Sequence, residues 1–152
     1  MILVSACLCG QRTRYDGRVL PPHPALAGLD PAQILALCPE VLGGLAAPRP
    51  PARLMGASPG REGLDVLAGR ARLVAADGRD VTAAFIAGAR EALRQALAAG
   101  VREAWLKDRS PSCAYDPAGA NPRGGPGLGV LAALLVQNGI TVKELRQSLR
   151  GD

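Results

Sequence analysis

Short apolar segments with the composition of buried strands recur along this chain, and helical segments separate some of them. Four segments are of this kind: residues 2–6, 34–37, 101–106 and 140–142. The clearest helix runs from about residue 81 to 99, with Asp80 or Thr82 as its N-cap. A second helix is predicted from about residue 128 to 138. This alternation predicts one α/β domain over residues 1–152, with a mostly parallel sheet flanked by helices.

Other segments predict smaller features of the domain. Residues 64–68 and 71–75, joined by Gly69 and Arg70, are predicted to form a small β-hairpin insertion. Residues 39–60 hold much of the proline and glycine, and a loop of that length inside a domain is usually functional or disordered. Because this loop begins next to Cys38, we expect it to be functional. We expect a short helix over residues 24–29 and a terminal helical turn over residues 144–149.

Three of the four cysteines follow predicted strands: Cys7, Cys38 and Cys113. The carboxyl ends of parallel strands meet at one edge of a sheet, so these thiols can meet as three ligands of one metal centre with an open position. Cys9, two residues after Cys7, is an alternative fourth ligand. The residues alone leave open that the cysteines are small buried hydrophobic side chains. His23, bounded by prolines, has no partner at ligand spacing and no predicted chemical role.

Polar side chains with catalytic potential surround these cysteines. Glu40 stands two residues after Cys38, where its carboxylate can act as a general acid or base. Ser110 and Ser112 supply hydroxyl groups next to Cys113, and Lys107 supplies an ammonium group nearby. Together these side chains predict a reaction site at the edge of the sheet.

The charge and hydropathy of the chain limit its function classes. The net charge is +5, but basic residues are scattered singly, and aromatic residues make up only 3% of the chain. That composition argues against a stacking platform for single-stranded nucleic acid. No apolar run approaches the roughly 20 residues that cross a bilayer, and residues 1–4 lack a basic leader. We therefore expect a cytoplasmic protein without a membrane partner.

The motifs resemble those of the TudS-like thiouracil desulfidase family, formerly catalogued as a domain of unknown function. The matching motifs include Val4-Ser5-Ala6-Cys7-Leu8, Arg14-Tyr15-Asp16-Gly17, Cys38-Pro39-Glu40, Pro48-Arg49-Pro50-Pro51 and Ser110-Pro111-Ser112-Cys113. They occur in order over nearly the whole chain.

The resemblance implies an oxygen-sensitive 4Fe–4S cluster on Cys7, Cys38 and Cys113. It also implies non-redox desulfuration of a thiolated pyrimidine, of the 2- or 4-thiouracil type, to the oxo base and sulfide. Glu40 matches the acidic residue of the family, and Ser110 or Ser112 matches its serine. Lys107 is expected to assist catalysis, and the expected substrate-binding residues are Arg49, Tyr15 and Asp16.

Three alternatives remain at this stage. The substrate can be a thiolated nucleoside within transfer RNA, although the chain carries no appended RNA-binding segment. A non-catalytic metal- or sulfide-binding module results if Cys9 completes a closed four-thiolate site. A nucleotide-binding fold is disfavoured, because the glycines of residues 124–129 lack the spacing of a dinucleotide fingerprint. The sequence leaves the oligomeric state open.

Overall fold

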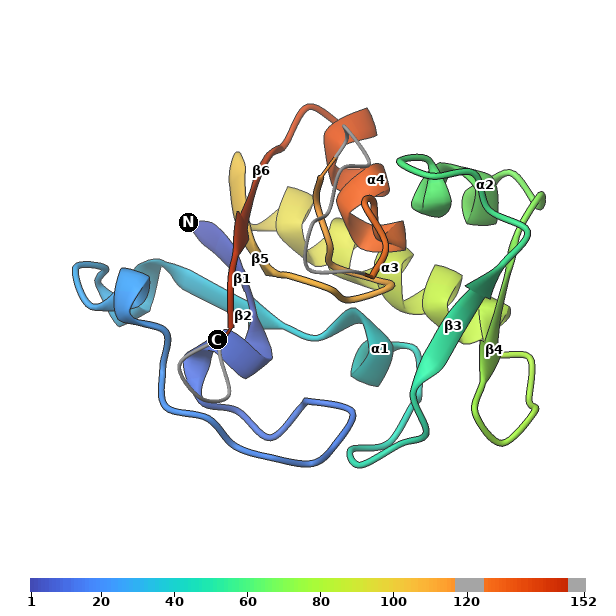
Figure 1. Cartoon of the computed structure of the whole chain (residues 1–152). Coiled ribbons are helices and arrows are strands. Elements are labelled where there is room, and N and C mark those ends of the chain that lie inside the picture. Colours follow the sequence, from blue (N-terminus) through green and yellow to red (C-terminus); the bar gives the residue numbers. More distant parts are fainter. Residues whose placement is uncertain (117–124, 148–152) are drawn as a thin grey trace.

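A four-stranded parallel sheet forms the centre of the structure, a computed structural model that describes residues 1–116 and 125–147 (Figure 1). Its strands are β1 (Ile2–Ser5), β2 (Ile34–Leu37), β5 (Glu103–Lys107) and β6 (Thr141–Leu145), in the order β2-β1-β5-β6. All neighbouring pairs are parallel. The chain passes from β1 to β2 on one side and later to β5 on the other, so a crevice opens beyond the carboxyl end of β1.

Helices pack on one face of this sheet and 3-10 turns cover the other. The helical side contains α3 (Thr82–Ala98) and α4 (Val130–Gln137), whose buried side chains join Leu3 and Leu106 in the larger apolar cluster. On the other face, η1 (Ala6–Cys9) and η2 (Pro24–Leu26) cover Val4 in a smaller cluster. A third turn, η3 (Pro31–Gln33), leads into β2. The predicted α/β class is confirmed, and residues 24–29 contain a single short turn in place of the expected helix.

The helix predicted from residue 81 is present, and its start has a simple cause. The Asp80 carboxylate accepts a hydrogen bond from the backbone N–H of Thr82 at 2.9 Å. That contact satisfies one of the N–H groups that a first helical turn leaves without a partner. The side chains that α3 buries are small apart from Phe85, so other backbone segments can approach it closely.

The small antiparallel pair exists, but the prediction of its first strand was wrong. It consists of β3 (Ala52–Met55) and β4 (Arg72–Ala75), whereas residues 64–68 lie in and just beyond helix α2 (Glu62–Leu67). Short apolar runs do not distinguish strand from helix. Here Asp65 is buried and accepts a hydrogen bond from the Ser58 N–H at 2.9 Å. The Glu62 carboxylate binds the backbone at Leu128, which holds α2 beside α4.

Two further expectations need correction. The segment 39–60 is not one loop, because it contains helix α1 (Pro39–Leu42) and strand β3. The terminal helical turn expected over 144–149 is wrong at its start, since β6 continues to Leu145 in register with Lys107 of β5. Residues 148–149, and Gly124 of the glycine-rich segment 124–129, lie outside the described part of the chain. None of the described helices combines the length and apolar character needed to cross a membrane.

Candidate active site

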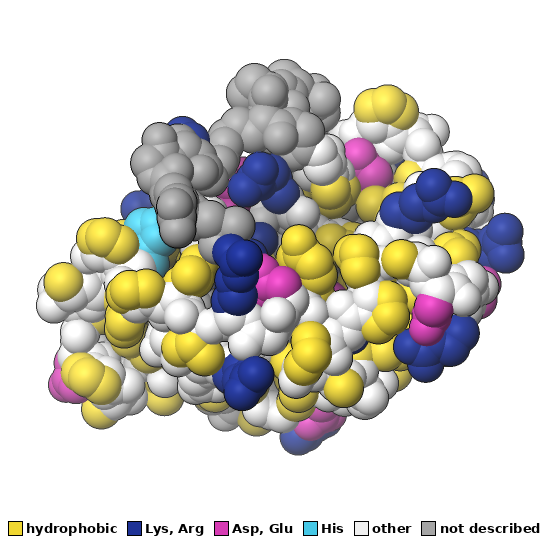
Figure 2. Space-filling model, turned by 60° about the horizontal axis from the view of Figure 1, so that its bottom comes forward, with side chains coloured by type: hydrophobic (Ala, Val, Ile, Leu, Met, Phe, Trp, Pro, Cys, Tyr) yellow, Lys and Arg dark blue, Asp and Glu magenta, His cyan; other side chains and the backbone are white. Residues whose placement is uncertain are grey.

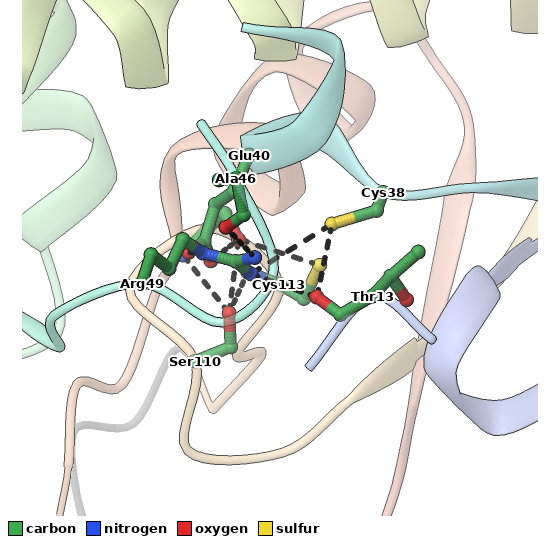
Figure 3. Close-up of polar contacts among 8 residues, drawn as sticks. Thr13, Cys38, Glu40, Ala46, Arg49, Ser110 and Cys113 are labelled. Atoms are coloured by element: carbon green, nitrogen blue, oxygen red, sulfur yellow. Dashed lines mark hydrogen bonds and ion pairs between the residues drawn. The ribbon is translucent and has the colours of Figure 1, made fainter. Parts of the chain in front are cut away.

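The loops that carry three cysteines meet in one cavity of about 250 Å³ at the carboxyl edge of the sheet. Cys7 lies in η1 just after β1, Cys38 just after β2, and Cys113 in the loop that follows β5. All three line the cavity. Figure 3 shows the sulfur atoms of Cys38 and Cys113 pointing into the same space. The fold thus brings together thiols that are 31 and 75 residues apart in sequence.

Cys9 takes a different place from these three cysteines. It lines a second cavity, with His23 and Leu26, on the side of the sheet covered by the 3-10 turns. Both ring nitrogens of His23 contact backbone groups there. Its Nδ1 accepts from the Ala25 N–H at 3.0 Å, and its Nε2 lies 2.9 Å from the Arg146 carbonyl oxygen.

Burial and mutual repulsion set the acidity of the three thiols. Burial first, and then the neighbouring Cys113 and Cys38 thiols, together raise the pKa of Cys7 to about 12 against the attraction of Lys107 and Arg14. Burial likewise raises the pKa of Cys113 to about 11 and raises that of Cys38. The free thiols are therefore protonated at neutral pH, and metal binding would have to displace their protons.

The donor set can be tested against the kind of metal group that it suits. Within residues 1–116 and 125–147, no three His, Cys, Asp or Glu side chains stand close enough together to hold a single metal ion. Three soft sulfur donors around one cavity are the ligands that iron–sulfur clusters use. The residues therefore fit a cluster with three protein ligands.

Glu40 is the anionic group of the cavity, and both of its oxygens have partners. It lies in the first turn of α1, immediately after the Cys38-Pro39 pair. Arg49 Nε donates to Glu40 Oε1 at 2.9 Å, and Ser112 Oγ donates to Oε2 at 2.8 Å. The carboxylate is thereby fixed between one cation and one hydroxyl.

Arg49 holds several segments together at this point (Figure 3). Besides Glu40, its guanidinium donates to the carbonyl oxygens of Thr13 at 2.9 Å and Ala46 at 3.0 Å. It also lies 4.0 Å from Cys38 Sγ, and its side chain is only 8% exposed. The sequence predicted that Arg49 binds substrate. The structure shows in addition that Arg49 connects helix α1, through Glu40, to the loop that contains Thr13.

The two serines differ in their contacts. Ser110 Oγ accepts from the backbone N–H groups of Ser112 at 3.2 Å and Cys113 at 3.1 Å, which shapes the loop. Ser112 Oγ contacts Glu40 directly and lies 2.9 Å from Ser110 Oγ. Glu40, Ser112 and Ser110 therefore form a continuous hydrogen-bonded chain. Both serines are buried.

The serine loop is anchored by the start of α4. The backbone N–H groups of Val130 and Leu131 donate to the carbonyl oxygens of Pro111 and Ser112 at 3.0 and 2.8 Å. A Cβ atom at Gly129 would lie 2.6 Å from the backbone nitrogen of Cys113, so a glycine is needed for this approach. The loop carbonyls satisfy the helix start in place of a side-chain cap.

The remaining predicted residues are not equivalent in position. Lys107 lines the cavity, and its Nζ donates to the Asp108 carbonyl oxygen at 2.9 Å. Tyr15 also lines it and is 44% exposed. Asp16 does not line it, because Arg14 Nε and Nη2 hold its two carboxylate oxygens at 3.0 and 2.9 Å. Those bonds lower the pKa of Asp16 to about 2.

Sequence reasoning missed two arginines of the cavity wall. Arg14 is buried beside Cys7, and only its place before Tyr15 in a matching motif pointed to it. Arg109 also lines the wall and has a left-handed backbone with a φ of 55°. Such a conformation is uncommon for a residue with a side chain, and no sequence pattern announces it here.

Comparisons with known proteins agree on one family. A family model described as 2-thiouracil desulfurase matches residues 2–146. An uncharacterized protein of Bacillus subtilis (strain 168), YbbK, is 39% identical over 145 residues, which is 93% of each chain. A solved structure described as the 4Fe–4S-dependent thiouracil desulfidase TudS is 40% identical, with a TM-score of 0.73. That match covers 94% of this chain and 89% of the other.

Proposed function

Because this chain belongs to the 2-thiouracil desulfurase family, we propose that it removes sulfur from a thiolated pyrimidine at a 4Fe–4S cluster. The family match confirms the resemblance inferred from the motifs. The substrate would be of the 2- or 4-thiouracil type, and the products its oxo base and sulfide. The observation that carries the proposal is the cavity in which three thiols face the chain of Glu40, Ser112 and Ser110.

Cys7, Cys38 and Cys113 would hold the cluster as thiolates. When bound, a cluster with three protein ligands supplies an iron with an open position, a Lewis acid that polarises the thiocarbonyl group. The protein wall beside it carries the basic side chains Lys107, Arg49 and Arg109. Positive charge at this wall stabilises the negative charge that develops on sulfur as water adds to the ring carbon.

Glu40 is the proposed base. A water bound at Ser112 Oγ can lose its proton to the Glu40 carboxylate through the hydroxyl, because that hydroxyl already donates to Oε2 at 2.8 Å. The water oxygen then bonds to the ring carbon. As it does so, the electron pair of the thiocarbonyl double bond moves to sulfur. The remaining carbon–sulfur bond then breaks with its electron pair on sulfur, the second proton of the former water passes from the new hydroxyl to that sulfur, and the oxo base and hydrosulfide leave. Oxygen replaces sulfur without any change of redox state, so no electron donor is required.

Ser110 has a supporting part in this proposal. Its hydroxyl lies 2.9 Å from Ser112 Oγ and receives two backbone N–H groups. It therefore fixes the direction in which Ser112 can donate. Lys107 is proposed to interact with the departing sulfur, since it lines the cavity on the side of Cys7.

The first test is the content of iron and acid-labile sulfide after reconstitution without oxygen, followed by turnover of 2-thiouracil and 4-thiouracil. We expect about four of each per chain. Cys7→Ala, Cys38→Ala or Cys113→Ala should abolish the cluster. Bound zinc alone, or no metal under these conditions, would contradict the proposal.

Two observations favour this function over the alternatives. Cys9 lies in the second cavity, so it does not complete a four-thiolate site in the first. Figure 2 shows Lys and Arg side chains spread among apolar and acidic ones over the face that it presents. A small thio-base is therefore favoured over transfer RNA. Activity on the small thio-base and on transfer RNA should be measured at increasing salt concentration. A steep loss of activity with added salt would instead indicate phosphate contacts.

A further inference from the structure

The segment that follows β6 reaches the back of the candidate active site. Leu145 accepts a hydrogen bond from the Asp108 N–H through its carbonyl oxygen at 3.1 Å. The Gln147 N–H donates to Asp108 Oδ1, also at 3.1 Å. These contacts fix the segment beside the loop that follows β5. Gln147 is only 6% exposed, whereas glutamine side chains mostly lie at the surface.

The side chain of Gln147 connects two residues of the cavity wall. Its Oε1 accepts from Arg14 Nη1 at 2.6 Å, and its Nε2 donates to the Cys7 carbonyl oxygen at 3.2 Å. Arg14 and Cys7 stand 133 and 140 residues earlier in the chain. One amide therefore ties the end of the sheet to the turn that presents Cys7 and to the buried guanidinium beside it.

The Cys7 turn has little else to hold its carbonyl group. The Gly10 N–H also points to this oxygen, but at the long distance of 3.4 Å. Arg14 is buried and shares its other donors with Asp16. Removal of the glutamine would leave one buried donor and one weakly bonded acceptor, both of which are costly in a protein interior.

We propose that Gln147 is a positioning residue of the site, which fixes the Cys7 turn through the Cys7 carbonyl oxygen and holds Arg14 beside it. A fixed turn keeps the Cys7 sulfur directed into the cavity with Cys38 and Cys113. The consequence for retention of a cluster rests on the proposed function. The effect on the reactivity of the Cys7 thiol in the metal-free protein is independent of that function.

The test compares Gln147→Ala and Gln147→Glu with the wild-type chain, all free of metal. Glutamate keeps an acceptor for Arg14 but cannot donate to Cys7 while ionised. Gln137→Ala, at an exposed position on α4, is the matched control. The readout is the alkylation rate of each cysteine by iodoacetamide, resolved by peptide mass spectrometry.

We expect Cys7 to react about tenfold faster in both variants, the order expected from one lost buried hydrogen bond. Cys113, which is also buried, should stay within about twofold of the wild type, as should every thiol of the control. A parallel rise at Cys7 and Cys113 would mean general loosening and would overturn the proposal. An unchanged alkylation rate of Cys7 would also overturn it. So would a faster rate in Gln147→Ala alone, because the hydrogen bond to the Cys7 carbonyl oxygen would then have no effect.

A second readout follows the reconstituted protein, in which both variants should lose iron to a chelator about tenfold faster than the wild type. Loss of iron at the wild-type rate would also count against the positioning role. Failure of the proposed function has a different signature, because the wild-type chain itself would then bind no iron. The alkylation rates would still decide the role of Gln147.

Discussion

Gly88→Ala should reduce activity by moving α1, although Gly88 itself lies on α3, outside the cavity. Helices α1 and α3 contact each other through their backbones here (Figure 1). A Cβ atom on Gly88 would lie 2.8 Å from both the Pro39 carbonyl carbon and the Gly43 nitrogen, and closer still to the Pro39 carbonyl oxygen. Neither partner is a flexible side chain that can turn away.

The size of the effect follows from this geometry. Carbon and oxygen atoms in contact are normally about 3.3 Å apart or more, so α1 must move by about 1 Å or more. Glu40 and Cys38 move with it, and a 1 Å misplacement of reacting groups costs about 10²-fold in rate. Overpacking costs about 1–3 kcal/mol, and the upper part of that range applies because the obstructing atoms are backbone; alanine in a helix returns up to about 1 kcal/mol, which leaves a net cost of about 1–2 kcal/mol. The melting temperature should fall by about 2–8 °C.

The assay is turnover of 4-thiouracil by reconstituted protein, with iron content and melting temperature measured on the same samples. Gly28→Ala is the control, because a Cβ atom there meets nothing within 4 Å. The control should match the wild type in all three measurements. Wild-type turnover and stability in Gly88→Ala would refute the reasoning that this contact positions Glu40.

Four further predictions concern individual side chains. Glu40→Gln should lower kcat by about 10²–10⁴-fold with iron content unchanged, as loss of a general base requires; full turnover would eliminate that role. Arg49→Lys should lower kcat about tenfold with little change in KM, because a single ammonium cannot reproduce the forked contacts of the guanidinium; a rise in KM alone would indicate substrate binding instead. The pKa of Asp16, lowered from 3.8 to about 2 by Arg14, predicts about 1–2 kcal/mol of stability that is present above pH 4 and lost as pH falls from about 4 to 2. Denaturant titrations at several pH values should show this loss, and Asp16→Asn should lack it. Cys9→Ala should keep its iron and its turnover within about twofold, since Cys9 lies in the other cavity; loss of iron would restore the four-thiolate reading.

The strands and the cysteine loops could be predicted because each depends on local sequence. A buried parallel strand is a short apolar run, and Cys7 and Cys38 follow such runs almost directly. The meeting of the cysteines then needs only the rule that the carboxyl ends of parallel strands share an edge, whatever the order of the strands. Glu40 lies close enough in sequence to Cys38 to be placed with it.

What failed, or could not be seen, depends on tertiary partners. Residues 64–67 are helical because Asp65 is buried with its own hydrogen bonds and α2 packs against α4, neither of which the local sequence of these four residues encodes. Asp16 looked available for substrate, yet Arg14 two residues earlier binds both of its oxygens. The partner of Arg14 in turn is Gln147, which lies 133 residues away and belongs to no motif.

The site is thus held at two separate contacts, and the two supports can be separated experimentally. Gly88 fixes the half that contains Cys38 and Glu40 by close approach of α3 to α1. Gln147 fixes the half that contains Cys7 through a side-chain amide. Gly88→Ala should therefore expose Cys38 to alkylation and leave Cys7 protected, whereas Gln147→Ala should do the reverse. If each substitution exposed both thiols equally, the cavity would open as one unit, and the division into two independently supported halves would be wrong.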